Sequence, residues 1–242
     1  LEQLQYASIL SYLLFNFNTK NKTEAEVIKE IGANLGGISS YVDVFRKHKS
    51  EECEVKFIIS AKNLVEKAGE LAKILDETTL YADFEDKEAL YNVLLEIKLM
   101  LESRFKNSGH AFVARRISGF YNPQSKLASY HGEYDFYLFI SELVNNYEQN
   151  SDKIKEQLYT VTSLIFNQAR LLVNFVGNKE EYTKLKEATE KAQKVYDEEK
   201  SIEKVKEEKS NLDKALEQYT KHKTDKENNS NSGNNNSNVV TP

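Results

Sequence analysis

The sequence predicts an all-α protein: a multi-helix bundle with a long charged C-terminal helix and a disordered polar tail. Only two of the 242 residues are proline and nine are glycine, so few positions force a helix to end. Apolar residues recur at helical spacing along most of the chain. The final stretch, in contrast, consists almost entirely of polar residues. These three observations together favour long helices over short strands joined by turns.

We expect three regions along the chain. Residues 1–177 form the helical bundle core, and residues 178–223 form a long charged helix, or two helices, that packs on this core. In this second region Lys and Glu surround a narrow apolar stripe, which suits a helix lying against a bundle. Residues 224–242 have too few apolar side chains to offset the entropy cost of ordering them, so they form a disordered tail or spacer.

The first helix is predicted over about Glu2–Phe17, where a wide stripe of apolar side chains recurs every three or four residues. The stripe consists of Tyr6, Ile9, Leu10, Leu13, Leu14 and Phe17. Only a core position would remove so wide a stripe from water. We therefore expect this helix to pack centrally.

A second helix is predicted from Glu24 to about Phe45. Thr23 and Glu26 have the spacing of a capping box, in which both side chains bind free amides of the first helical turn. The stretch "IGANLGG" then interrupts the apolar pattern with three glycines, each of which costs up to about 1 kcal/mol relative to alanine within a helix. We interpret these glycines as a kink or a close helix crossing, with a hinge as the alternative.

A third helix is predicted over about Glu51–Asp76, because its apolar residues fall near one face. Cys53 lies near the start of this helix, and no histidine lies within the same helical turn. We therefore expect Cys53 to be a small buried hydrophobe rather than a reactive thiol.

Three further helices are expected. Asp83–Asp86 can cap a fourth helix that runs to about Lys106. Glu133–Gln149 is rich in aromatic residues and is predicted to be helical. Ser151–Asp152 can cap a last core helix, whose apolar stripe continues to Phe175.

The sequence contains none of the motifs that usually accompany catalysis. A phosphate-binding glycine loop, a GxSxG turn, an HExxH pair and paired CxxC motifs are all missing. The histidines, His48, His110, His131 and His222, are scattered, and the single cysteine cannot form an intramolecular disulfide. We therefore predict a protein that is not an enzyme and that binds neither a cofactor nor a metal ion.

The charge pattern narrows the range of partners. The net charge of −5 is mild, and Lys and Glu are interspersed rather than grouped in blocks, so no strong field favours nucleic acid. No stretch reaches the roughly 18 uninterrupted apolar residues that a membrane span needs. We expect a protein partner and no nucleic acid, and membrane contact only through a covalent anchor that this sequence does not contain.

One segment, Asn107–Gly132, has no sustained apolar period and mixes basic with aromatic residues. Arg and Tyr are enriched at binding hot spots, and long structureless loops are disproportionately functional. The candidate partner-binding residues are Arg115, Arg116, Phe120, Tyr121, Lys126, Tyr130 and His131. The alternative is a short helix and a loop whose aromatic side chains anchor it to the bundle and whose arginines pair with acidic residues.

The helical body without tryptophan or disulfides, the Lys/Glu-rich C-terminal helix and the tail "NNSNSGNNNSN" resemble the merozoite surface antigens of apicomplexan blood parasites. They resemble, less closely, the helical surface lipoproteins of Borrelia. The first resemblance implies a polar spacer ahead of a GPI-anchor signal. It carries no functional residue over to this chain.

This resemblance leads to a functional hypothesis. We expect a non-enzymatic surface antigen or adhesin on the extracellular face of the cell membrane, which binds a host or partner protein and is held off the membrane by its polar tail. The alternative is an intracellular, cytoplasmic helical adaptor or scaffold that pairs with another helix through its C-terminal helix.

Overall fold

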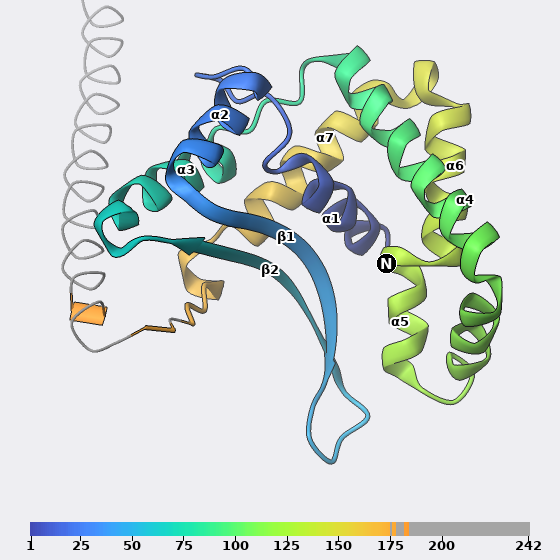
Figure 1. Ribbon diagram of the computed structural model, residues 1–242. Helices are drawn as coiled ribbons and strands as arrows, with labels where there is room; N and C mark the ends of the chain where they lie inside the picture. The colour runs from blue at the N-terminus through green and yellow to red at the C-terminus, as the bar shows by residue number, and fades with distance from the viewer. Residues whose placement is uncertain (175, 178–181, 184–242) are drawn as a thin grey trace, which may run out of the picture. The chain divides into compact units, whose positions relative to one another are not determined.

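The computed structural model describes residues 1–174, 176–177 and 182–183 (Figure 1). The chain divides at Asn178, and the first unit, Leu1–Asn178, is compact. The long charged helix predicted over 178–223 and the tail predicted over 224–242 therefore lie outside the described residues, except for two positions. None of the described helices is both long and apolar enough to cross a membrane.

The described part of the first unit contains seven α-helices and one β-hairpin (Figure 1). The elements are, in chain order, α1 (Glu2–Leu13), α2 (Glu24–Asn34), β1 (Leu35–Arg46), β2 (Cys53–Asn63), α3 (Ala68–Leu80), α4 (Lys87–Ser118), α5 (Pro123–Gly132), α6 (Tyr134–Asn145) and α7 (Tyr147–Ile165). Short 3-10 turns follow β2, at Val65–Lys67, and α7, at Gln168–Arg170.

The hairpin overturns the predicted all-α class. The two strands pair antiparallel, with Val44 opposite Val55, where helices had been expected over Glu24–Phe45 and Glu51–Asp76. Both strands are rich in β-branched and aromatic side chains, which pack well on a pleated surface. These side chains fit the helical and the strand period equally, so the spacing alone misled the prediction.

Two of the three glycines expected to kink the second helix, Gly36 and Gly37, follow its end instead, whereas Gly32 lies within α2. Helix α2 stops at Asn34, and the register of the hairpin shifts between Leu35 and Gly37. Gly37 has a φ of 147°, a backbone conformation that side-chain-bearing residues rarely adopt. The glycine therefore allows the chain to pass directly from helix into strand.

Helix α1 lies at the centre of the core, as predicted. It contacts α4, α5, α7 and β1 (Figure 1). All six side chains of the predicted stripe, Tyr6, Ile9, Leu10, Leu13, Leu14 and Phe17, are at most 4% exposed, although the helix ends at Leu13 and not at Phe17 as predicted. Fully burying one such side chain contributes roughly 1.5–3 kcal/mol, so α1 is a major source of stability.

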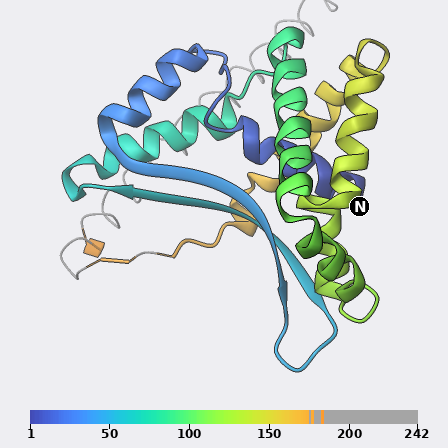
Figure 2. The same ribbon diagram turned by 45° about the vertical axis from the view of Figure 1, so that its right-hand side comes forward.

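The remaining helices complete this core from both sides. Figure 2 shows α4 and α6 running side by side, and the two helices contact each other. Four side chains of α4 and two of α6 are at most 2% exposed: Leu90, Leu94, Ile97, Leu101, Phe136 and Ile140. Ile154 and Leu158 of α7 are fully buried as well.

Two of the three helix caps predicted from the sequence are present in the structure. Thr23 and Glu26 form the expected capping box, and Asp86 accepts a hydrogen bond from the Ala89 amide at the start of α4. The cap predicted at Ser151–Asp152 is wrong, because α7 already begins at Tyr147 and Ser151 is a buried position within it. The same helix ends at Ile165, earlier than its apolar stripe suggested.

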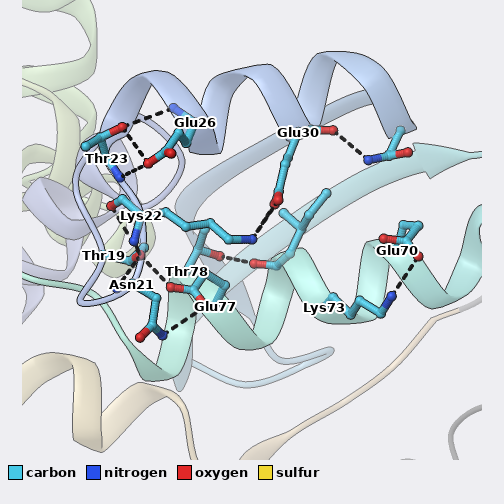
Figure 3. Close-up of polar contacts among 12 residues, drawn as sticks. Thr19, Asn21, Lys22, Thr23, Glu26, Glu30, Glu70, Lys73, Glu77 and Thr78 are labelled. Atoms are coloured by element: carbon cyan, nitrogen blue, oxygen red, sulfur yellow. Dashed lines mark hydrogen bonds and ion pairs between the residues drawn. The ribbon is translucent and has the colours of Figure 1, made fainter.

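The loop between α1 and α2 is fixed to α3 by polar contacts (Figure 3). The Thr19 hydroxyl donates to Glu77 Oε1 at 2.5 Å, and Asn21 Nδ2 donates to Glu77 Oε2 at 3.2 Å. Lys22 Nζ lies 2.6 Å from Glu30 Oε2 and so connects the same loop to α2. These contacts hold α2 beside α3 at the base of the hairpin.

Candidate interaction surface

The segment Asn107–Gly132 is helical, which corrects its interpretation as a long loop. Helix α4 changes direction at Ser108, where the backbone leaves the helical region (φ −139°, ψ 33°), and continues to Ser118. Its aromatic residues keep packing beyond the kink, since the ring centres of Phe105 and Phe112 lie 4.2 Å apart. After a tight turn, α5 begins at Pro123, and the Asn122 side chain caps it.

Two of the predicted binding residues, Arg115 and Arg116, form ion pairs within the chain. Arg115 Nη1 lies 3.1 Å from Glu133 Oε1, and Arg116 Nη1 lies 2.5 Å from Asp135 Oδ2. The Ser129 hydroxyl donates to the same oxygen of Asp135 at 2.5 Å. We call Arg115, Arg116, Glu133 and Asp135 the arginine clamp, because they join the end of α4 to the α5–α6 junction.

Burial changes the pKa of Glu133, one of the two acidic residues of the arginine clamp. The Glu133 side chain is only 13% exposed, and its burial raises the pKa of the carboxyl group, although the charge of Arg115 opposes that rise. Arg116 also lies 5.8 Å from the centre of the Tyr134 ring, within the range of a cation–π contact. The guanidinium groups are therefore occupied internally, as the alternative interpretation of this segment expected.

The next two predicted residues point into solvent. Phe120 is 79% exposed and Tyr121 is 87% exposed, and neither anchors the turn to the bundle. Val113 and Ile117, on the last turns of α4 just before this turn, are also exposed. We call Val113, Ile117, Phe120 and Tyr121 the α4 tip. Exposed apolar patches on a protein surface mark interaction sites, which makes the α4 tip a candidate.

Helix α5 connects the α4 tip to the hairpin. Gln124 Nε2 donates to the Val44 carbonyl of β1 at 2.6 Å. A Cβ atom at Gly119 would lie only 3.2 Å from the Arg116 carbonyl and 3.5 Å from Lys126 Cα, so glycine allows the two helices to approach closely. Lys126 is exposed on α5, and it has no ion-pair partner among the described residues.

The last two predicted residues, Tyr130 and His131, are half-buried on α5. The Nε2 atom of His131 is buried without a hydrogen-bond partner in the described part of the chain. Burial lowers the pKa of His131, and the nearby charge of Asp43 opposes this shift. Among residues 1–174 and the few others described, no group of three or more His, Cys, Asp or Glu side chains could hold a metal ion.

A cavity of about 340 Å³ opens on another side of the core, between α1, α6 and α7. Its walls include Glu2, Tyr6, Glu142 and Lys153. Lys153 Nζ lies 3.6 Å from Glu2 Oε1. Burial and the two acidic side chains raise the pKa of Tyr6 to about 12, so its phenol stays protonated at neutral pH.

The hairpin presents a second surface, which the sequence-based prediction missed. Val42 and Val44 face the core, whereas Tyr41 and Phe45, on the opposite face of β1, are 44% and 42% exposed. Ile58 of β2 lies directly opposite Tyr41 and is half-exposed. We call Tyr41, Phe45 and Ile58 the outer face of the hairpin. Cys53, expected inside a helix, is instead the half-exposed first residue of β2.

Comparison with known proteins relates the chain to a peptidase family. Residues 1–143 match the family model that describes a domain associated with M16 peptidases of subfamily C. The chain is 25% identical over 185 residues to Protein HypA of Clostridium perfringens, covering 76% of this chain and 19% of that protein. It is 21% identical over 191 residues to Presequence protease 1, chloroplastic/mitochondrial, of Arabidopsis thaliana, covering 78% of this chain and 18% of that protein.

These similarities overturn the resemblance to apicomplexan and Borrelia surface proteins, together with the expected antigen function, host interaction and GPI anchor. The resemblance rested on composition, mostly that of the C-terminal third, whereas the family model matches the folded helices and the hairpin. The chain spans about a fifth of the length of the two curated relatives. Because the match covers more than half of the chain, this protein belongs to the family of domains associated with M16 peptidases of subfamily C.

Proposed function

We propose that this chain is an accessory, non-catalytic domain that works beside the catalytic part of an M16-type peptidase. The observation that carries the proposal is the family match over residues 1–143, which extends from α1 to α6. In both relatives the matched segment is a minor share of the protein. The remaining polypeptide of such a peptidase is large enough to hold the catalytic centre.

The surface of the chain supports a role in holding other protein parts. The α4 tip and the outer face of the hairpin expose aromatic and aliphatic side chains, and aromatic residues are enriched at interface hot spots. Both surfaces are attached to a firmly packed core, and the arginine clamp fixes the α4 tip against α5 and α6. A scaffold of this kind can position a catalytic part without supplying reacting groups.

The name of the plant relative supports a location inside the cell. That protein is called a presequence protease and is chloroplastic or mitochondrial. By analogy, this chain acts inside the cell, and the peptidase that it accompanies cleaves short, basic targeting peptides, which are amphipathic and poor in acidic residues. The intracellular scaffold, kept above as the alternative hypothesis, is therefore the better interpretation of the sequence.

The test is whether peptidase activity accompanies the chain. The native protein is isolated from its source with an antibody against residues 1–174, and hydrolysis of an unstructured fluorogenic peptide is measured in the isolate. The recombinant 242-residue chain is assayed in parallel. We expect hydrolysis by the native isolate and none by the recombinant chain. A native isolate without peptidase activity would contradict the proposed function. Hydrolysis by the recombinant chain, which lacks any other part of the peptidase, would contradict it as well.

A further inference from the structure

We infer that the outer edge of β2 accepts an added β-strand from the catalytic part of the peptidase. This inference rests on the proposed function, and it names the surface through which the accessory domain and the catalytic part are joined. Strand addition to a sheet edge combines backbone hydrogen bonds with side-chain contacts at alternate positions.

The first observation is the size of the sheet. Among the described residues there is one sheet, and it contains two strands of 12 and 11 residues. An isolated two-stranded hairpin is marginally stable in water, and it gains stability from further strands or from helices packed on it. Here β1 lies against α1, α2 and α5. Figure 1 shows that the hairpin is also long, and that its turn projects away from the helices. The end of the hairpin that projects beyond the helices would gain stability from a third strand.

The two edges of the sheet differ. Both strands contact helices, β1 with α1, α2 and α5 and β2 with α3, but the edge of β1 is also covered by Gln124, which donates a hydrogen bond to the Val44 carbonyl. Within the described residues, the backbone groups of β2 have no hydrogen-bond partner outside β1. As far as the described residues go, the amide and carbonyl groups on the outer edge of β2 are therefore available for a further strand.

Natural proteins protect exposed edges with proline, bulges, short strands or charged side chains. Strand β2 contains no proline, it is long, and the one register irregularity of the hairpin lies in β1. Its charged side chains are Glu54, Lys56 and Lys62, and Glu54 lies 3.3 Å from Lys56. Only Lys62 lacks an ion-pair partner among the described residues.

The side chains of β2 define the chemistry of the incoming strand. The run Phe57–Ile58–Ile59 places apolar groups on both faces of the sheet. Phe57 already packs edge-to-face on Phe166 at 5.6 Å, which fixes the inner face. The complementary strand has apolar residues at its centre and an acidic residue beside Lys62, because cross-strand pairs of opposite charge stabilise sheets.

The catalytic part is a better source for this strand than a second copy of the chain. In the two relatives, about four-fifths of the protein lies outside the matched segment. A strand within the same assembled peptidase has an effective concentration in the millimolar range, whereas a second copy must associate at its own much lower concentration. The strand from the peptidase therefore occupies the edge first.

Hydrogen–deuterium exchange tests the inference. Exchange is measured on the native peptidase, isolated through the antibody, and on the recombinant 242-residue chain, with fragmentation that resolves single amides of Cys53–Asn63. We expect the outward-facing amides of β2 to exchange at least about tenfold more slowly in the native peptidase. The hairpin turn, residues 47–52, is the internal control and should exchange equally in both samples.

Two results would overturn the inference while leaving the proposed function intact. One is equal exchange of the β2 amides in both samples, although the native isolate hydrolyses peptide. The other is full protection of the β2 amides in the recombinant chain. If light scattering then shows a dimer, a second copy of the chain occupies the edge. If it shows a monomer, residues 179–242 occupy it. Loss of hydrolysis in the native isolate would instead contradict the proposed function.

A charge-reversed variant sharpens the assignment of Lys62. Lys62→Glu is introduced into the native peptidase, with Lys29→Glu on the exposed face of α2 as the matched control. We expect the outward amides of β2 to exchange about fivefold faster with Lys62→Glu and to remain unchanged with Lys29→Glu. Unchanged protection in Lys62→Glu would contradict the acidic partner that the inference places beside this lysine.

Discussion

Helix α1 and the β-hairpin are both built on apolar side chains, but they remove them from water to different degrees. Ile9, Leu10 and Leu13 of α1 are completely buried, whereas Tyr41 and Phe45 of the hairpin are 44% and 42% exposed. The helix realises its hydrophobic stabilisation within the chain itself. The exposed apolar side chains of the hairpin can provide further hydrophobic stabilisation only when a partner binds and covers them. Stability and recognition are therefore assigned to different parts of the fold.

Helix α4 shows the same contrast along its own length. Before the kink at Ser108, Leu94 and Leu101 are completely buried. After the kink, Val113 and Ile117 are more than half exposed. The kink thus separates a segment that builds the core from a segment that presents the α4 tip. The following predictions test this division, beginning with the largest expected effect on the free energy of unfolding.

Leu94→Ala removes a completely buried side chain from the core half of α4. We expect the free energy of unfolding to fall by about 2–5 kcal/mol, because apolar contacts are lost and a cavity remains. Leu99→Ala in the same helix is the control: Leu99 is 55% exposed, so its replacement should cost no more than about 0.5 kcal/mol. Urea denaturation followed by circular dichroism measures both, and equal losses would contradict the division.

Arg116→Ala opens the arginine clamp. The change removes the contacts to Asp135 and Ser129 and the stacking on Tyr134. Because the guanidinium group is half exposed, solvent weakens these contacts, and we expect a loss of about 1 kcal/mol. Arg104→Ala, on the exposed side of α4, should change stability little. If the two variants lose the same stability in urea, Arg116 does not act as a clamp.

The sequence could predict some of these features and not others. The stripe of α1, the Thr23–Glu26 capping box and the Asp86 cap are local signals, and the structure confirms them. The hairpin was missed because its apolar residues satisfy two periods at once: Ile38, Val42 and Phe45 fit a helix, whereas Val42 and Val44 alternate with Tyr41 and Phe45 as in a strand. The high density of β-branched residues after Gly36–Gly37 was the signal that could have favoured a strand over a helix.

The arginine clamp could not be predicted from local spacing. Arg115 and Arg116 meet Glu133 and Asp135, which lie 18 and 19 residues later, only because the chain reverses direction after Gly119. The edge of β2 is also invisible in the sequence, since it depends on which neighbours a strand lacks. Both features depend on contacts between elements, and these contacts follow from the tertiary fold.

His131 provides a pH-dependent test of the packing of α5 on the hairpin. Burial lowers the pKa of His131 below its ordinary value of 6.5, so the unfolded chain binds the proton more tightly than the folded chain. The burial of neutral His131 therefore contributes stability above the ordinary pKa. This contribution is lost as the pH falls from that value through the lowered pKa of the folded chain. We expect His131→Leu to lose less stability than the wild type between about pH 7.5 and about pH 5.5.

Urea titrations at the two pH values measure this difference, which should be smaller than the effect of opening the clamp. His110→Leu, at an exposed position of α4, controls for the loss of a histidine. An identical acid-induced loss in the wild type and in His131→Leu would show that the packing of α5 does not depend on the protonation of His131.

Tyr41→Ser separates recognition from stability most directly. Tyr41 is 44% exposed on the outer face of the hairpin, so we expect its replacement to change the free energy of unfolding by only about 0.5 kcal/mol. Because exposed tyrosines are frequent hot spots, peptide hydrolysis by the native peptidase should fall about tenfold when the catalytic part is no longer held in place. Tyr81→Ser is a matched control, since Tyr81 is also 44% exposed but lies at the end of α3. If both variants, made in the native peptidase and isolated with the antibody, hydrolyse peptide at equal rates, the outer face of the hairpin does not hold the catalytic part.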